Sequence, residues 1–259
     1  MKFCKLVLLS LLTLSNALKH VLLENHHFIN LIGPVTKNSV DAILWEWNDP
    51  VVQKNMNETQ KTTLYINSPG GSVHAGSNLI QYMRALQAQN ITIDCIGENF
   101  MSMAFVIFQA CDHRMVLENS IGMQHQMSFG LRGNIENMRT SFAMHDRINE
   151  NIIAMELAKI GIDRESYNAK IAHDWWIIGS DNVEQNTADE LVLYSCSQEI
   201  YQMTQVRREK VSHYTFHVYT HKCPLFKDVE VTESNYSMFY DHSSYNQFDY
   251  SAFFSSFFV

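Results

Sequence analysis

Three residues have the types that hydrolysis by a serine nucleophile requires. Ser102 precedes an apolar stretch typical of a helix, His125 follows the short strand-like run Ile121–Gln124, and Asp174 lies further along the chain. A serine nucleophile needs a base to take its proton, an acid to orient that base, and N–H donors for the oxyanion. Each residue also has an ordinary alternative: a helix N-cap, a structural histidine and a solvated aspartate. Together they predict a hydrolytic α/β enzyme.

The elements that must position these residues alternate between strand and helix. Thr62–Ile66 is a β-rich run that meets the glycine turn at Gly70 and Gly71, and a helical pattern follows it. The same order recurs with Ile91–Ile96 as a strand and Ser102–Ala110 as an apolar helix. Such alternation predicts a parallel sheet covered by helices.

A long helical pattern follows the strands. It runs from Ile135 to about Ile160, and Gly161 is a plausible C-terminal stop. A second helix is expected over Arg164–Ala172, and the compact domain is predicted to end near Ser197.

The segment Leu64–Gly76 resembles the glycine-rich signature of the proteolytic subunit of the Clp protease. Three further segments follow in the order that the family shows: Ile96–Ala104, Glu118–Gln126 and the long helix that leads to Asp174. The similarity covers about Phe28 to Val192. It implies a ClpP/crotonase-type β/α spiral domain in an α/β fold class, and a serine endopeptidase that cleaves peptides or unfolded proteins.

The resemblance also implies a role for each candidate residue. The family's nucleophile falls on Ser102, its general base on His125 and its orienting acid on Asp174. Asp163 and Asp181 are competing acids, but neither stands at the matching position. A Ser-His-Asp triad is the predicted catalytic site.

The remaining implied features concern the oxyanion, the substrate groove and assembly. The oxyanion donors fall on the backbone N–H groups of Gly71 and Met103, and Gly70 and Ser72 are assigned to the groove. The long helix Ile135–Ile160 matches the family's handle, through which two seven-membered rings stack around a chamber. A homo-oligomer is therefore expected.

Several residues depart from the family's pattern. Glu98, Phe100 and Met101 stand where the family usually has small or amide residues, which predicts a narrower or more acidic groove. Met127 replaces the proline that usually follows the His-Gln pair, which predicts a different local loop.

Composition and the N-terminus set the expected class and compartment. The 259 residues carry a net charge of −8, which argues against nucleic acid as a partner, and no internal apolar run is long enough to span a membrane. Residues 1–17 show two lysines, an apolar run and small residues at the end, the pattern of a secretory signal peptide. A secretory location follows. The family's ATPase unfoldase partner would there lack an obvious supply of ATP.

Removal of the signal peptide would take Cys4 with it and leave four cysteines, an even number compatible with an oxidising compartment. The sequence cannot choose among their three pairings. Cys95 lies in an apolar strand-like run and is expected to be a buried free thiol, whereas Cys196 and Cys223 are candidates for a disulfide.

Residues 198–259 are predicted to form a C-terminal extension, partly disordered, with an aromatic tail over Met238–Val259. His213, His217 and His221 recur every four residues, but the intervening residues favour a strand, where such positions lie about 13 Å apart and cannot chelate one ion. No metal and no cofactor are expected.

Two alternatives come from other classes. A catalytically inactive ring or scaffold subunit would keep the fold without turnover, with the aromatic tail as its interaction element. An acyl-CoA enzyme of the crotonase type would share a related fold, but the Ser102, His125 and Asp174 set in the family's order argues against it.

Overall fold

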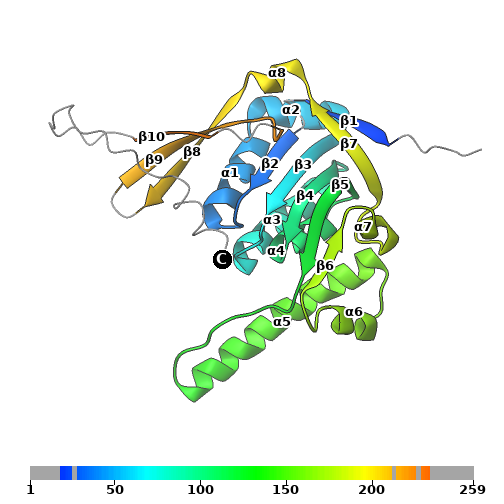
Figure 1. Ribbon diagram of the computed structural model, residues 1–259. Helices are drawn as coiled ribbons and strands as arrows, with labels where there is room; N and C mark the ends of the chain where they lie inside the picture. The colour runs from blue at the N-terminus through cyan, green and yellow to red at the C-terminus, as the bar shows by residue number, and fades with distance from the viewer. Residues whose placement is uncertain (1–17, 25–27, 212–213, 226–228, 234–259) are drawn as a thin grey trace, which may run out of the picture. The chain divides into compact units, whose positions relative to one another are not determined.

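The computed structural model describes residues 18–24, 28–211, 214–225 and 229–233 (Figure 1). The elements are, in chain order, β1 (Lys19–Leu23), β2 (Phe28–Ile32), α1 (Lys37–Trp47), α2 (Pro50–Thr59), β3 (Lys61–Ser68), α3 (Val73–Gln87), β4 (Thr92–Met101), α4 (Met103–Gln109), β5 (His113–Gln124), α5 (Ile135–Ile160), α6 (Arg164–Lys170), β6 (Trp175–Ile178), α7 (Asp181–Glu184), β7 (Glu190–Cys196), α8 (Gln198–Tyr201), β8 (Thr204–Val211), β9 (Tyr214–His221) and β10 (Val229–Glu233). The predicted signal peptide and the aromatic tail lie outside the described residues.

The central sheet confirms the predicted alternation of strands and helices. Its strand order is β1-β7-β5-β4-β3-β2, and every neighbouring pair is parallel. β6 also pairs with β5 and is antiparallel to it. Parallel strands place their carboxyl ends at one edge, so the segments that follow β3, β4 and β5 begin close together.

Strand β5 pairs first with β7 and then, further along its length, with β6. Met115 and Val116 pair with β7, whereas the stretch from Ile121 to Gln124 pairs with β6. Between these stretches, the Ser120 hydroxyl accepts from the Leu117 N–H (2.7 Å) and donates to the Gly97 carbonyl. The far half of β5 therefore carries its end to β6 and to the predicted site.

The helices α4 and α5 differ in how much of their surface is buried. The seven residues of α4 are all buried, whereas on α5 the buried residues are Ile153, Glu156 and Ile160, all in its last turns. Figure 1 shows the first half of α5 projecting away from the sheet. Phe142, on that half, is 55% exposed. The same region was predicted to be the handle.

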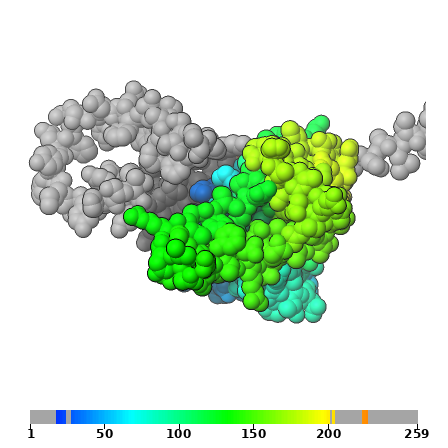
Figure 2. All heavy atoms as spheres, turned by 90° about the horizontal axis from the view of Figure 1, so that it is seen from below, coloured from blue at the N-terminus to red at the C-terminus, as the bar shows by residue number. Residues whose placement is uncertain are grey.

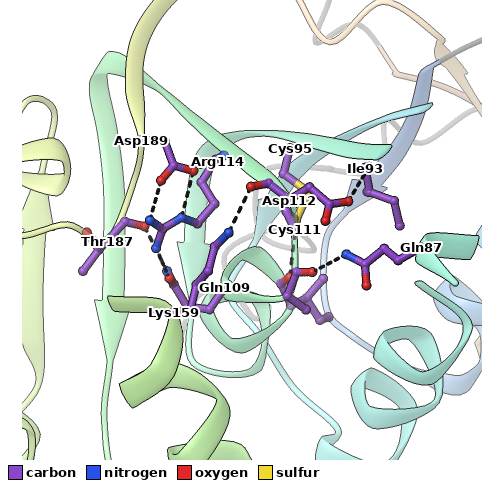
Figure 3. The surroundings of a disulfide bond; sticks show 12 residues. Gln87, Ile93, Cys95, Gln109, Cys111, Asp112, Arg114, Lys159, Thr187 and Asp189 are labelled. Carbon is purple, nitrogen blue, oxygen red and sulfur yellow. Dashed lines mark hydrogen bonds and ion pairs between the residues drawn. A yellow bond between two sulfur atoms is a disulfide. The ribbon is translucent and has the colours of Figure 1, made fainter. Parts of the chain in front are cut away.

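Two disulfides are present among the described residues. Cys196 pairs with Cys223, as the sequence suggested. Cys95 pairs with Cys111 (Figure 3), so its prediction as a free thiol is wrong. The reason is topological: α4 runs back along β4, so the residue after the helix returns to the strand, and the two Cα atoms lie 6.0 Å apart.

The chain divides into two compact units. The larger extends to Met203 and includes a segment from His221 to Lys227, of which 221–225 is described. The smaller contains a three-stranded sheet in the order β10-β9-β8. β9 confirms the strand predicted around His217. Within the described ranges, no helix has the length and apolar character needed to cross a membrane.

Candidate active site

Ser102 occupies a sharp turn between β4 and α4. Its backbone has φ 53° and ψ −123°, a conformation that costs a residue with a side chain about 1–3 kcal/mol and is stored where the surroundings enforce it. The Ser102 N–H donates to the Met123 carbonyl (2.8 Å), and its side chain makes no cap hydrogen bond. Ser102 thus stands at the N-cap position of α4, but its hydroxyl does not cap the helix. This is the strand-to-helix geometry that exposes a serine nucleophile.

His125 lies directly beyond β5 and faces Ser102. Parallel pairing of Met101 with Met123 brings the ends of β4 and β5 side by side. The His125 Nε2 lies 2.8 Å from the Ser102 Oγ. A base at this distance can take the hydroxyl proton.

Asp174 lies near His125 in the pairing of β5 with β6, but the two side chains share no hydrogen bond among the described residues. Gln124 pairs with Trp175 in the antiparallel ladder, so Asp174 stands one position beyond this pair, on the side of His125. Its side chain is exposed, and among the described residues no hydrogen bond or ion pair joins Asp174 to His125. The structure thus brings together two of the three predicted residues by direct contact.

The competing acids have other positions. Asp163 caps α6 by accepting from the Ser166 N–H (2.9 Å), and hydrogen bonds from Ser166 lower its pKa. Asp181 is the exposed first residue of α7. Neither is bonded to His125.

The glycine turn lies against the nucleophile. Gly70 has φ 90°, and a Cβ added there would come within 2.5 Å of the Met101 carbonyl oxygen and 2.7 Å of the Ser102 Cβ. Gly71 has φ 141°, and its N–H, like that of Met103, has no hydrogen-bond partner among the described residues. Two backbone donors near the serine suit an oxyanion.

Ser72, predicted in the groove, has a local structural role. It is the N-cap of α3, and its hydroxyl accepts from the Ala75 N–H (3.3 Å). Gly70 is buried and does not line the pocket beside Ser102. The pocket beside the nucleophile is lined instead by the neighbouring Gly71 and Val73.

This pocket has a volume of 140 Å³ and a mostly apolar wall that includes Met103, Val106 and Ile153. The residues expected to narrow or acidify it do not line it. Phe100 is fully buried against Phe108. Glu98 accepts from the Tyr65 hydroxyl and, at 3.1 Å, from the Asn67 side chain. Glu98 thus has its partners on the neighbouring strand β3, and Phe100 packs against helix α4.

The acid that lines the pocket is Glu156, which the sequence analysis missed. It is fully buried on α5, and burial raises its pKa to about 7, although hydrogen bonds from Tyr167 and Gln124 act in the opposite direction. Its position is in helical phase with Ile153 and Ile160. A charged residue on the apolar face of an amphipathic helix is the signal that could have identified it in the sequence.

Among the residues that the structure describes, no group of three His, Cys, Asp or Glu side chains is arranged to hold a metal ion. The chemistry available at this pocket is that of the Ser102–His125 pair, the free backbone donors and the buried glutamate. A serine in a strained strand-to-helix turn, with a histidine at hydrogen-bond distance, is an arrangement that serine hydrolases use.

Comparison with known proteins identifies the family. A family model of the Clp protease matches residues 16–194, so the chain belongs to the Clp protease family. It is 29% identical to the "ATP-dependent Clp protease proteolytic subunit" of Deinococcus radiodurans over 140 residues, which cover 53% of this chain and 68% of that protein. It is also 29% identical to "ATP-dependent Clp protease proteolytic subunit 1" of Borreliella burgdorferi, over 66% of this chain and 87% of that protein. Family membership supports a Clp protease-like peptidase.

Proposed function

We propose that the protein is a serine endopeptidase in which Ser102 is the nucleophile and His125 the general base. The 2.8 Å contact between the His125 Nε2 and the Ser102 Oγ carries the proposal. The strained turn at Ser102, the adjacent pocket and membership of the Clp protease family support it.

The reaction would begin when the Ser102 oxygen attacks a peptide carbonyl and its proton passes to the His125 Nε2. The N–H groups of Gly71 and Met103 would bind the oxyanion, since both are free among the described residues. Collapse breaks the peptide C–N bond, and His125 returns its proton to the leaving amine. A water molecule, deprotonated by the same histidine, then hydrolyses the acyl-enzyme.

Asp174 is assigned to orient His125, because its position one step beyond the Gln124–Trp175 pair places it on that side of the base. We infer that assembly into rings brings it into contact. The projecting half of α5, which carries exposed Ile135 and Phe142, is the proposed ring-stacking handle. Peptides and unfolded chains are the proposed substrates, as an enclosed chamber would exclude folded proteins.

The test is labelling with a fluorophosphonate serine probe of protein lacking residues 1–17 and sized by gel filtration. Wild-type protein should be labelled, Ser102→Ala should not, and Asp174→Asn should be labelled roughly a thousandfold or more slowly, as expected when a triad loses its orienting acid. Absence of labelling in an assembled ring would overturn the proposal. It would favour the second candidate, an inactive scaffold subunit, which the missing Asp174–His125 bond keeps open.

A secretory location is proposed from the N-terminal pattern and is supported by the two disulfides, which persist in oxidising compartments. N-terminal sequencing of the expressed protein should begin near Leu18. A sequence beginning at Met1 or Lys2 would contradict it. An ATPase partner is not part of the proposal.

A further inference from the structure

A buried carboxylate joins three elements below the nucleophile. The Glu156 Oε1, on α5, accepts from the Gln124 side-chain amide of β5 (2.5 Å), and the Oε2 accepts from the Tyr167 hydroxyl of α6 (2.5 Å). All three side chains are buried, with exposures of 0%, 4% and 1% for Glu156, Gln124 and Tyr167. These three residues are called the Glu156 network below. Figure 2 shows the face formed by α5 and the segment after it, which covers this part of the molecule.

The Glu156 network reaches the general base through one residue. The other end of the Gln124 amide, its Oε1, accepts from the backbone N–H of His125 (3.1 Å). Two successive hydrogen bonds thus connect Glu156 to the backbone of His125. Among the described residues, Asp174 makes no hydrogen bond with His125. The hydrogen bonds with Gln124 and Ser102 are therefore those that hold His125 beyond the end of β5.

The ionised form of Glu156 is an acceptor at both oxygens and so suits the two donors, whereas the protonated form brings a donor of its own into the site. No cation lines the pocket: its other titratable side chains are His125 and Tyr167, and burial raises the pKa of the tyrosine, which keeps it a donor. α4 presents apolar residues and Gln109, and Arg164 of α6 pairs with Glu150 at the surface. An acid so held, without a compensating charge, is costly for the fold and calls for a functional account.

We propose that Glu156 is a positioning residue for the peptidase reaction: it fixes the Gln124 side chain, which in turn fixes the backbone of His125 opposite Ser102. The inference rests on the proposed function. In its ionised form Glu156 orients the Gln124 amide so that its oxygen faces the His125 N–H. When Glu156 is protonated, it accepts more weakly and its own O–H competes with the hydroxyl of Tyr167, so the Gln124 amide and the base are held less firmly.

The experiment compares Glu156→Leu, Glu156→Gln and the matched control Glu150→Gln, a surface glutamate of the same helix. The second-order rate of fluorophosphonate labelling is measured against pH and divided by the folded fraction from circular dichroism. Glu156→Leu should label about 10- to 100-fold more slowly at pH 8, the scale of a small misplacement of a catalytic group, and the difference should shrink at acid pH, where the wild-type Glu156 is itself protonated. Glu156→Gln, which keeps an acceptor for Gln124, should lose less, and Glu150→Gln should match the wild type.

The shape of the pH profile separates positioning from mere stabilisation. The wild-type acid limb should fall more steeply than that of Glu156→Gln, because the protonation of Glu156 adds to the loss in the wild type and glutamine does not titrate. Equal slopes in the two proteins, with folded Glu156→Gln labelled as fast as wild type, would overturn the inference while leaving the peptidase intact. If the wild type is not labelled at all, the proposed function fails and this inference fails with it.

Discussion

Strand β5 carries a buried polar network at each end, and the two differ in how charge is balanced. At its beginning, Arg114 is 1% exposed and is bound by Asp189, Gln109 and the Asn186 carbonyl. At its end, Gln124 belongs to the Glu156 network. The first network pairs a cation with an anion, and the second holds an anion with neutral donors alone.

The Arg114 network (Arg114, Asp189, Gln109 and Asn186) joins a buried arginine to a partly exposed aspartate. Figure 3 shows Arg114 with Asp189 and Gln109. The Arg114 Nη2 and Nε donate to the two Asp189 oxygens at 2.6 and 3.1 Å, and the Arg114 N–H adds a bond of 2.7 Å. Burial alone would raise the pKa of Asp189, but the hydrogen bonds and charge of Arg114 lower it. The pair therefore stays ionised and ties β5 to the start of β7.

The Glu156 network has no such counter-charge among the described residues, and burial raises the pKa of its carboxyl group to about 7. A protein that maximised its stability would place an apolar side chain there. The contrast teaches that similar hydrogen-bond geometry serves different ends: the network far from Ser102 is neutralised, and the one next to Ser102 remains able to titrate.

The largest expected effect is on the Arg114 network. Arg114→Leu should lower the free energy of unfolding by about 3 to 4 kcal/mol, because it leaves the buried Gln109 oxygen without its donor and removes the charged hydrogen bonds to the partly exposed Asp189. Urea denaturation at pH 7.5 measures this. Arg139→Leu, which breaks an exposed pair with Glu136, is the control and should change little. A loss below about 1 kcal/mol in Arg114→Leu would remove the distinction between the two ends of β5.

The Glu156 network should make stability depend on pH. The pKa of Glu156 is raised from 4.5 to about 7, so the folded state holds a proton that the unfolded state releases between these values. Wild-type stability should thus fall by about 3 kcal/mol as the pH rises from 5 to 8. The pKa of Asp189 is lowered, so its contribution to stability is lost only when the pH falls below the usual pKa range of an aspartate. That range lies outside the interval from pH 5 to 8.

Glu156→Gln should flatten that dependence, since glutamine does not titrate. Both proteins contain His125, so the difference between their unfolding curves at pH 5 and 8 isolates Glu156. Equal slopes in the two proteins would mean that the buried carboxyl does not titrate in this range.

The smallest expected effect is at the surface pair of Arg164 with Glu150, whose charged atoms lie 2.5 Å apart and whose side chains are 40% and 52% exposed. Glu150→Gln should change the free energy of unfolding by less than about 0.5 kcal/mol, because water screens the pair. Thermal melts at low and high salt provide the measurement. A change as large as that of Arg114→Leu would show that burial is not what separates the networks.

Much of the fold and part of the site followed from local patterns. The alternation of apolar runs with glycine turns predicted a parallel sheet, and the serine after the second strand proved to be a strained turn facing His125. The Cys95–Cys111 disulfide was missed because it depends on how α4 folds back along β4. The sequence did not show that Glu98 bonds Tyr65 and Asn67, because these partners belong to another strand.

The sequence by itself determined the order of elements and the glycines that allow a close approach to Ser102, while the predicted triad came from the family resemblance. The elements and the glycines depend on side-chain type and on neighbours within a few positions, which periodicity and turn chemistry record. Only the tertiary structure decided that Glu156 lies beside the nucleophile and bonds Gln124 and Tyr167, and that Asp174 stays exposed. The reason is that burial and hydrogen bonding join residues far apart in the chain, so the balance of charge at a site exists only after folding.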